Sequence, residues 1–121
     1  MKPIDLEQFI ARKLAFTRAT FGPGERRDGI IAHARKELVE IKLAERPAQR
    51  HMEWVDLINL GIHGLTHSLL AEGYHTSRAA ERAVELLVEK QTTLEMRAWP
   101  DWRTLPEDAA IEHDRSGEKA S

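Results

Sequence analysis

The chain has 121 residues, of which 41% are apolar and 31% charged, so it is long enough for one domain with a modest core. Its net charge of −2 argues against a protein that binds nucleic acid non-specifically. The absence of cysteine excludes disulfides, thiolate zinc sites and thiol nucleophiles.

Apolar residues recur at helical spacing in four segments, and no segment alternates with the two-residue period of a strand. The first predicted helix runs from about Asp5 to Ala19 and ends at the helix-breaking sequence FGPG, residues 21–24. The second begins near Asp28 and ends before Pro47.

The third predicted helix extends from about Gln49 to Glu72, because Gly73 suits the C-terminus of a helix. The fourth begins at Thr76 or Ser77, since either side chain can cap the first turn.

Pro100 closes the fourth helix, and the polar, acid-rich sequence beyond it has no helical pattern. The sequence therefore predicts an all-α fold of four helices with an irregular C-terminal tail. We expect one domain over residues 1–115 and a disordered segment over residues 116–121.

Two pairs of carboxylates form the most informative pattern in the chain: Glu37 with Glu40, and Glu53 with Asp56. The members of each pair are three residues apart, so they share one face of a helix. Glu37 and Glu53 fall on or beside the apolar stripes of their helices, where an acid needs a partner. Because Mg²⁺ and Mn²⁺ prefer such oxygen ligands, the pattern predicts one metal site and a reaction on phosphates. The alternative is that the acids lie on solvated helix faces.

The acidic pattern resembles that of the all-α nucleoside triphosphate pyrophosphohydrolases, the MazG-like superfamily. The similarity is closer to the dATP/dGTP diphosphohydrolase domain of phage and bacterial proteins. It covers about residues 9–115 and is carried by FGPG (21–24), KELVEI (36–41), EWVDL (53–57), KQ (90–91), RAWPDWR (97–103) and IEH (111–113).

The resemblance implies a four-helix bundle that assembles into homodimers or homotetramers. It implies hydrolysis of a nucleoside triphosphate between its α and β phosphates, giving a monophosphate and pyrophosphate. The catalytic residues and Mg²⁺ ligands would be Glu37, Glu40, Glu53 and Asp56, and one of the glutamates could instead serve as the general base.

Six residues are candidates for substrate binding under this resemblance: Lys36, His63, Lys90, Arg97, Trp99 and Arg103. Lys90 and Arg97 are seven residues apart, so they lie on one side of the fourth helix and would approach the phosphates. A solvated stripe is their alternative role.

The tryptophans have several possible roles. We expect Trp99 and Trp102 to plug the end of the bundle or a subunit interface, with base stacking as the alternative for either ring. Asp101 and Arg103 are expected to form a salt bridge in this turn. Trp54 is expected in the core.

Two positions depart from the related domain. An aspartate in its third helix is replaced here by His63, and an asparagine in its fourth helix by Leu94. These changes leave open a reduced or redirected activity, or a binding module that has lost turnover. A separate alternative is a structural helical dimerisation domain in which the acids form a hydrated seam.

The histidines suggest a further alternative. His63 and His67 are four residues apart, a spacing that zinc sites use, but no third ligand or HExxH motif accompanies them. His33 is expected near the acidic face, and His51, His75 and His113 at the surface or at helix ends.

The N-terminal sequence has no apolar segment of a signal peptide, and no stretch is apolar for long enough to span a membrane. We therefore expect a cytoplasmic protein, in a bacterium or a phage-infected host, without a membrane or nucleic-acid partner.

Overall fold

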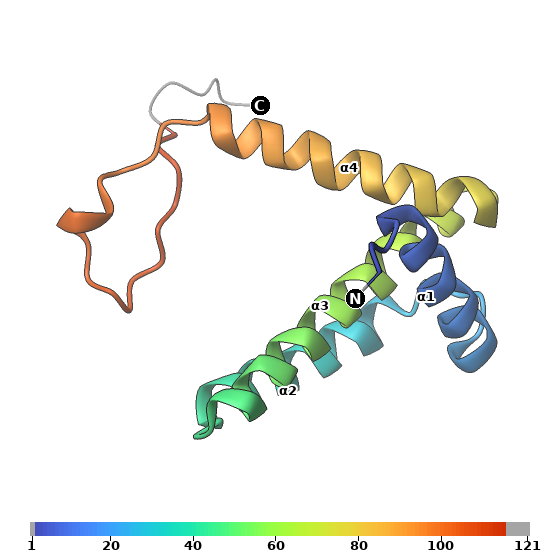
Figure 1. Ribbon diagram of the computed structural model, residues 1–121, viewed down its shortest axis with the longest axis horizontal. Coiled ribbons are helices and arrows are strands. Elements are labelled where there is room, and N and C mark those ends of the chain that lie inside the picture. Colours follow the sequence, from blue (N-terminus) through green and yellow to red (C-terminus); the bar gives the residue numbers. More distant parts are fainter. Residues whose placement is uncertain (1, 116–121) are drawn as a thin grey trace. The chain divides into compact units, whose positions relative to one another are not determined.

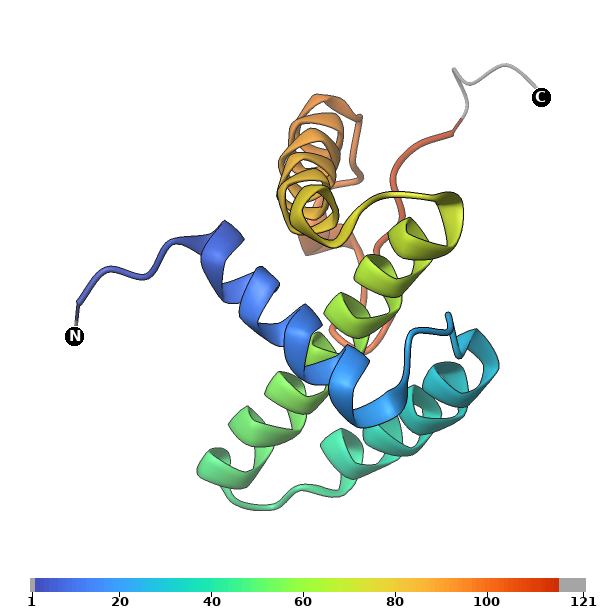
Figure 2. The ribbon, with the colours of Figure 1, turned by 90° about the vertical axis from the view of Figure 1, so that its right-hand side faces the viewer.

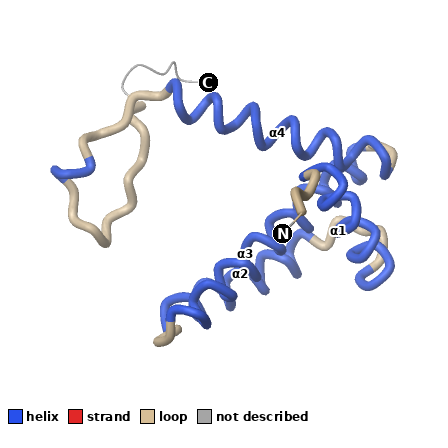
Figure 3. Tube along the Cα trace, viewed as in Figure 1, coloured by secondary structure: helices blue, strands red, loops and turns tan. Residues whose placement is uncertain are grey.

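The computed structural model describes residues 2–115, which form four α-helices and one short 3-10 helix (Figure 1). The α-helices are α1 (Leu6–Phe21), α2 (Arg27–Leu43), α3 (Pro47–Glu72) and α4 (Thr76–Met96), and the 3-10 helix is η1 (Trp102–Thr104). Figure 3 shows no strand in this part of the chain. The predicted all-α class with four helices is confirmed, whereas the predicted disordered segment lies outside the described residues.

The chain divides into two compact units, which meet between Glu85 and Leu86 within α4. The single domain expected over residues 1–115 spans both units. No helix in the described part of the chain is long and apolar enough to cross a membrane.

The first unit is organised around α3. The short connection of residues 44–46 lets α2 fold back along α3, and α1 crosses α3 (Figure 2). Buried apolar residues of this unit come from the helices α1, α3 and α4 and from the connection after α2: Ile10, Leu14, Ala44, Leu69, Ala79, Ala80 and Ala83. The three alanines of α4 are at most 1% exposed.

Local interactions explain where these helices begin and end. The Asp5 carboxylate accepts a hydrogen bond from the Gln8 amide at 3.0 Å and caps α1. Pro47, which was expected only as the limit of the second helix, is the first residue of α3. Its ring fixes a helical φ, and its missing N–H has no role in the first turn. Gly73 ends α3 at a φ of 116°, as its position predicts.

The cap of α4 differs from the prediction. His75, rather than Thr76 or Ser77, precedes the helix, and its Nδ1 accepts a hydrogen bond from the Ser77 amide at 3.2 Å. The His75 carbonyl also accepts the amides of Arg78 and Ala79. An imidazole therefore has the role that a hydroxyl was expected to have.

Two side chains also differ from expectation. Trp54 is 49% exposed, so its placement in the core was wrong. It lies one residue after Glu53, about 100° further around α3, and therefore turns away from the face that meets α2. His113 was expected at the surface but is nearly buried, with its ring edge-on to Trp99.

In the second unit the segment after α4 closes a loop on itself. The Trp99 indole donates a hydrogen bond to the Leu94 carbonyl at 2.8 Å, and the Asp114 amide donates to the Ala98 carbonyl at 2.7 Å. The predicted salt bridge is present, with Arg103 Nε at 3.1 Å from the Asp101 carboxylate. Trp99 and Trp102 both remain exposed in the single chain, so a role at a subunit interface stays a prediction.

Candidate metal centre and its cavity

Three of the four predicted acids converge where α2 lies against α3. Glu37 and Glu40 from α2 and Glu53 from α3 each place one carboxylate oxygen within 4.8 Å of the others. Glu37 is only 5% exposed, and the other two are half-buried. The three-residue spacing and the short connection between the helices together produce this convergence, which we call the carboxylate cluster.

Two carboxylate oxygens of the cluster have no polar partner among the described residues. One oxygen of Glu37 and one of Glu53, both Oε2, are buried without a hydrogen-bond partner in the described chain. Burial, and then the neighbouring carboxyl groups of Glu37 and Glu40, raise the pKa of Glu53 to about 7. A divalent cation would satisfy both unpartnered oxygens and relieve the repulsion, so these residues fit Mg²⁺ or Mn²⁺.

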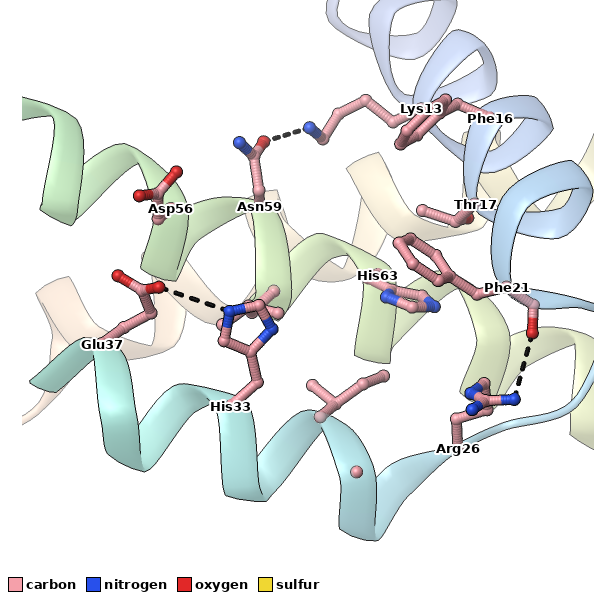
Figure 4. A pocket seen from close by; sticks show the side chains of 13 residues that line it. Lys13, Phe16, Thr17, Phe21, Arg26, His33, Glu37, Asp56, Asn59 and His63 are labelled. Atoms are coloured by element: carbon pink, nitrogen blue, oxygen red, sulfur yellow. Dashed lines mark hydrogen bonds and ion pairs between the residues drawn. The ribbon is translucent and has the colours of Figure 1, made fainter.

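Asp56 lies one turn beyond Glu53 on α3 and is exposed. It is not part of the three-residue cluster, but it lines the same cavity as Glu37 (Figure 4). A carboxylate in this position can contact an ion or its water shell once a ligand occupies the cavity.

The cavity extends from the carboxylate cluster along α1, α2 and α3 and has a volume of about 540 Å³. Figure 4 shows Glu37 and Asp56 towards one end and Phe21, Arg26 and His63 towards the other. The remaining lining residues are Lys13, Phe16, Thr17, Gly29, Ile30, His33, Asn59 and Leu60. Its size suits a small molecule with a polar end and a flat apolar end.

Several polar lining residues were not predicted. Lys13 on α1 donates a hydrogen bond to Asn59 on α3, and burial followed by the charge of Arg12 lowers the pKa of Lys13. Arg26 has a φ of 51°, in the left-handed region that only a few non-glycine residues adopt. Its guanidinium donates to the Phe21 carbonyl at 3.3 Å. The FGPG sequence indicated a loop here, but nothing in the sequence indicated that this loop borders the site.

His33 lies beside the cluster, as expected. Its Nε2 is 3.3 Å from Glu37 Oε1, one helical turn away on α2. This contact gives Oε1 of Glu37 a polar partner and orients the carboxylate.

His63 and His67 do not form a zinc site. His67 is fully buried and uses both ring nitrogens, with Nδ1 at 2.8 Å from the Gly24 carbonyl and Nε2 at 2.8 Å from the Thr17 hydroxyl. The edge of its ring contacts His63 at a centroid distance of 4.5 Å. Within residues 2–115, the carboxylate cluster is the one group of acids and histidines close enough to hold a metal.

The other candidate substrate contacts come from α2 and from the second unit. Lys36 is exposed on α2 and does not line the cavity. The remaining four belong to the second unit: Lys90, Arg97, Trp99 and Arg103.

The unusual pKa of Glu53 predicts how the stability of the metal-free protein depends on pH. The folded protein holds this proton up to about pH 7, whereas the unfolded chain releases it near 4.5. The stabilisation from the protonated form is thus complete below pH 4.5 and lost as pH rises through about 7. Chemical denaturation across this range should show the loss in wild type and not in Glu53→Gln. Parallel curves for the two proteins would contradict the assignment.

Among the comparisons with known proteins, the one with family models found a match. No curated protein and no solved structure matches the chain. A family model described as dATP/dGTP pyrophosphohydrolase matches residues 9–117, which include the carboxylate cluster, the cavity and the WPDWR segment. The chain therefore belongs to the dATP/dGTP pyrophosphohydrolase family.

Proposed function

We propose that this protein is a Mg²⁺-dependent pyrophosphohydrolase that converts dATP, dGTP or a related deoxynucleoside triphosphate into the monophosphate and pyrophosphate. The observation that carries the proposal is the carboxylate cluster, with its two buried, unpartnered oxygens, at one end of a 540 Å³ cavity. Membership of the family supports the class of reaction. We place the protein in the cytoplasm, where its substrates occur.

In this proposal Glu37, Glu40, Glu53 and Asp56 hold the metal, and Mn²⁺ can replace Mg²⁺ on the same oxygens. When bound, the metal would neutralise phosphate charge and lower the pKa of the attacking water. A glutamate of the cluster that is not holding an ion would accept the proton of that water.

The chain also supplies positive charge and orientation. Lys13, held by Asn59 one turn beyond Asp56, brings a cation into the cavity. His33 fixes the carboxylate of Glu37. Lys36, Lys90, Arg97, Trp99 and Arg103 remain proposed substrate contacts that rest on the resemblance.

A screen of nucleoside triphosphates with Mg²⁺ or Mn²⁺ tests the reaction. We expect pyrophosphate, not orthophosphate, because attack at the α phosphate separates these products. Chelation of the metal should abolish release. A protein that binds a triphosphate but releases neither product would instead be a binding module, the role that His63 and Leu94 leave open. Orthophosphate as the first product would contradict the proposal.

We further propose that the protein is a homodimer or homotetramer. Seven large apolar side chains near the connected ends of α2 and α3 are exposed in the single chain: Leu38, Val39, Leu43, Met52, Trp54, Val55 and Ile58. A second subunit would cover such a surface. Sedimentation at micromolar concentration should show a multiple of 13.8 kDa, and a 13.8 kDa species alone would contradict this prediction.

A further inference from the structure

The end of the cavity away from the carboxylate cluster has the character of a nucleobase subsite. His63 follows Asp56 by seven residues on α3, which places it roughly 10 Å further along the helix axis. Because both residues line one cavity, a single extended ligand can contact the acids at one end and His63 at the other (Figure 4). If the proposed function is correct, the phosphates occupy the acidic end and the base reaches His63.

Aromatic rings border this end. The ring of Phe21 stacks on the His63 imidazole, with centroids 5.3 Å apart and an angle of 25° between the planes. Phe16 meets Phe21 edge-to-face at 6.2 Å. Phe21 is 45% exposed, so its side chain has room to shift and stack on a flat ligand that enters this end of the cavity.

His63 lacks a hydrogen-bond partner. Its side chain is 8% exposed, and Nε2 is buried with no partner in the described chain. Burial and the neighbouring His67 and Arg26 lower its pKa, so at neutral pH the ring is uncharged and offers one donor and one acceptor. A buried polar atom without a partner is costly, and a bound ligand that supplies the partner explains why it is retained.

At this end of the cavity the charged residue is Arg26, whose guanidinium only donates hydrogen bonds. Arg26 uses part of its guanidinium on the Phe21 carbonyl and keeps further N–H groups. The Thr17 hydroxyl is already bonded to His67. A ligand that presents acceptors therefore fits this end best.

The two purines differ in this respect. Guanine carries two adjacent acceptors, O6 and N7, which an arginine guanidinium pairs with in a bidentate manner, whereas adenine places an amino donor at position 6. We propose that this end of the cavity is a nucleobase subsite that selects guanine over adenine. In it Arg26 pairs with the edge bearing O6 and N7, His63 pairs with the adjoining edge, and Phe21 stacks on the base. This inference rests on the proposed function.

Kinetics with dGTP, dITP and dATP test the selection, because dITP retains O6 and N7 but lacks the 2-amino group. We expect wild-type kcat/KM for dGTP and dITP to exceed that for dATP by roughly 10- to 100-fold, the range for one bidentate pair.

Arg26→Asn and His63→Phe should each bring the ratio towards one. Asparagine tolerates the left-handed backbone of Arg26, and phenylalanine keeps a stacking ring at position 63. Arg27→Asn is the matched control, since Arg27 is exposed and does not line the cavity. An equal rate on all three substrates, or an unchanged ratio in both variants, would overturn the proposal.

Binding of dGMP, dAMP and pyrophosphate, measured by calorimetry, separates this inference from the proposed function. Tighter binding of dGMP than of dAMP, lost in Arg26→Asn while pyrophosphate binding is kept, supports the subsite even if no triphosphate is hydrolysed. Equal binding of the two monophosphates overturns it. If Arg26→Asn loses as much pyrophosphate binding as dGMP binding, the proposal is also overturned, because Arg26 would then bind phosphate rather than the base. His63→Phe removes an unpartnered nitrogen and should melt no lower than wild type. If it does not fold, Arg26→Asn still decides between these outcomes.

Discussion

Replacement of Glu53 by glutamine is expected to lower pyrophosphate release by at least about two orders of magnitude while the helices remain folded. Glutamine has nearly the same size, but its neutral amide neither attracts a cation nor accepts a proton from water. The carboxylate of Glu53 is the contribution of α3 to the cluster, within 4.8 Å of the oxygens of Glu37 and Glu40. Steady-state rates over a range of Mg²⁺ concentrations would measure the loss, and circular dichroism would confirm the fold.

The same substitution should raise the melting temperature of the metal-free protein at and above neutral pH. Wild-type Glu53 must then ionise beside two other carboxylates, and the amide avoids that repulsion. If the variant loses activity and gains stability, the charge of Glu53 serves the reaction rather than the stability of the fold. Glu72→Gln is the control, because Glu72 is exposed at the end of α3 and should leave both quantities unchanged. A Glu53→Gln protein that retains the wild-type rate would remove the carboxylate cluster from the mechanism.

Helical periodicity was sufficient to predict the four helices, and each observed helix starts within two residues of its predicted start. Turn chemistry explains the agreement, because FGPG, Pro47 and Gly73 leave few other places for a helix to stop or start. The convergence of Glu37, Glu40 and Glu53 was also predictable, since it needs only paired spacing and a short connection between two helices.

The cavity could not be predicted in the same way. Lys13 and Asn59 meet because α1 crosses α3, and a crossing angle depends on how the side chains of two helices interdigitate. No single helix carries that information. Trp54 shows a related limit of sequence patterns. A large apolar residue predicts that its side chain makes a contact, but not whether the partner belongs to the same chain.

His67 connects three parts of the first unit, and its loss is expected to cost more stability than that of any surface histidine. The ring is fully buried; Nδ1–H donates to the Gly24 carbonyl, so in the neutral ring Nε2 accepts from the Thr17 hydroxyl. His67→Leu would leave the Gly24 carbonyl and the Thr17 hydroxyl without their imidazole partner. We expect the free energy of unfolding to fall by roughly 2–5 kcal/mol, as for other broken buried hydrogen-bond networks.

A double-mutant cycle with Thr17→Val would isolate the link between α1 and α3. If the hydrogen bond matters, Thr17→Val should cost little once His67 is already leucine. His51→Leu is the control, because His51 is exposed near the start of the same helix. The loop that His67 holds through Gly24 also carries Arg26, so His67→Leu should raise KM for the triphosphate more than it lowers kcat. Additive costs in the cycle, together with an unchanged KM, would show that His67 merely fills space between the helices.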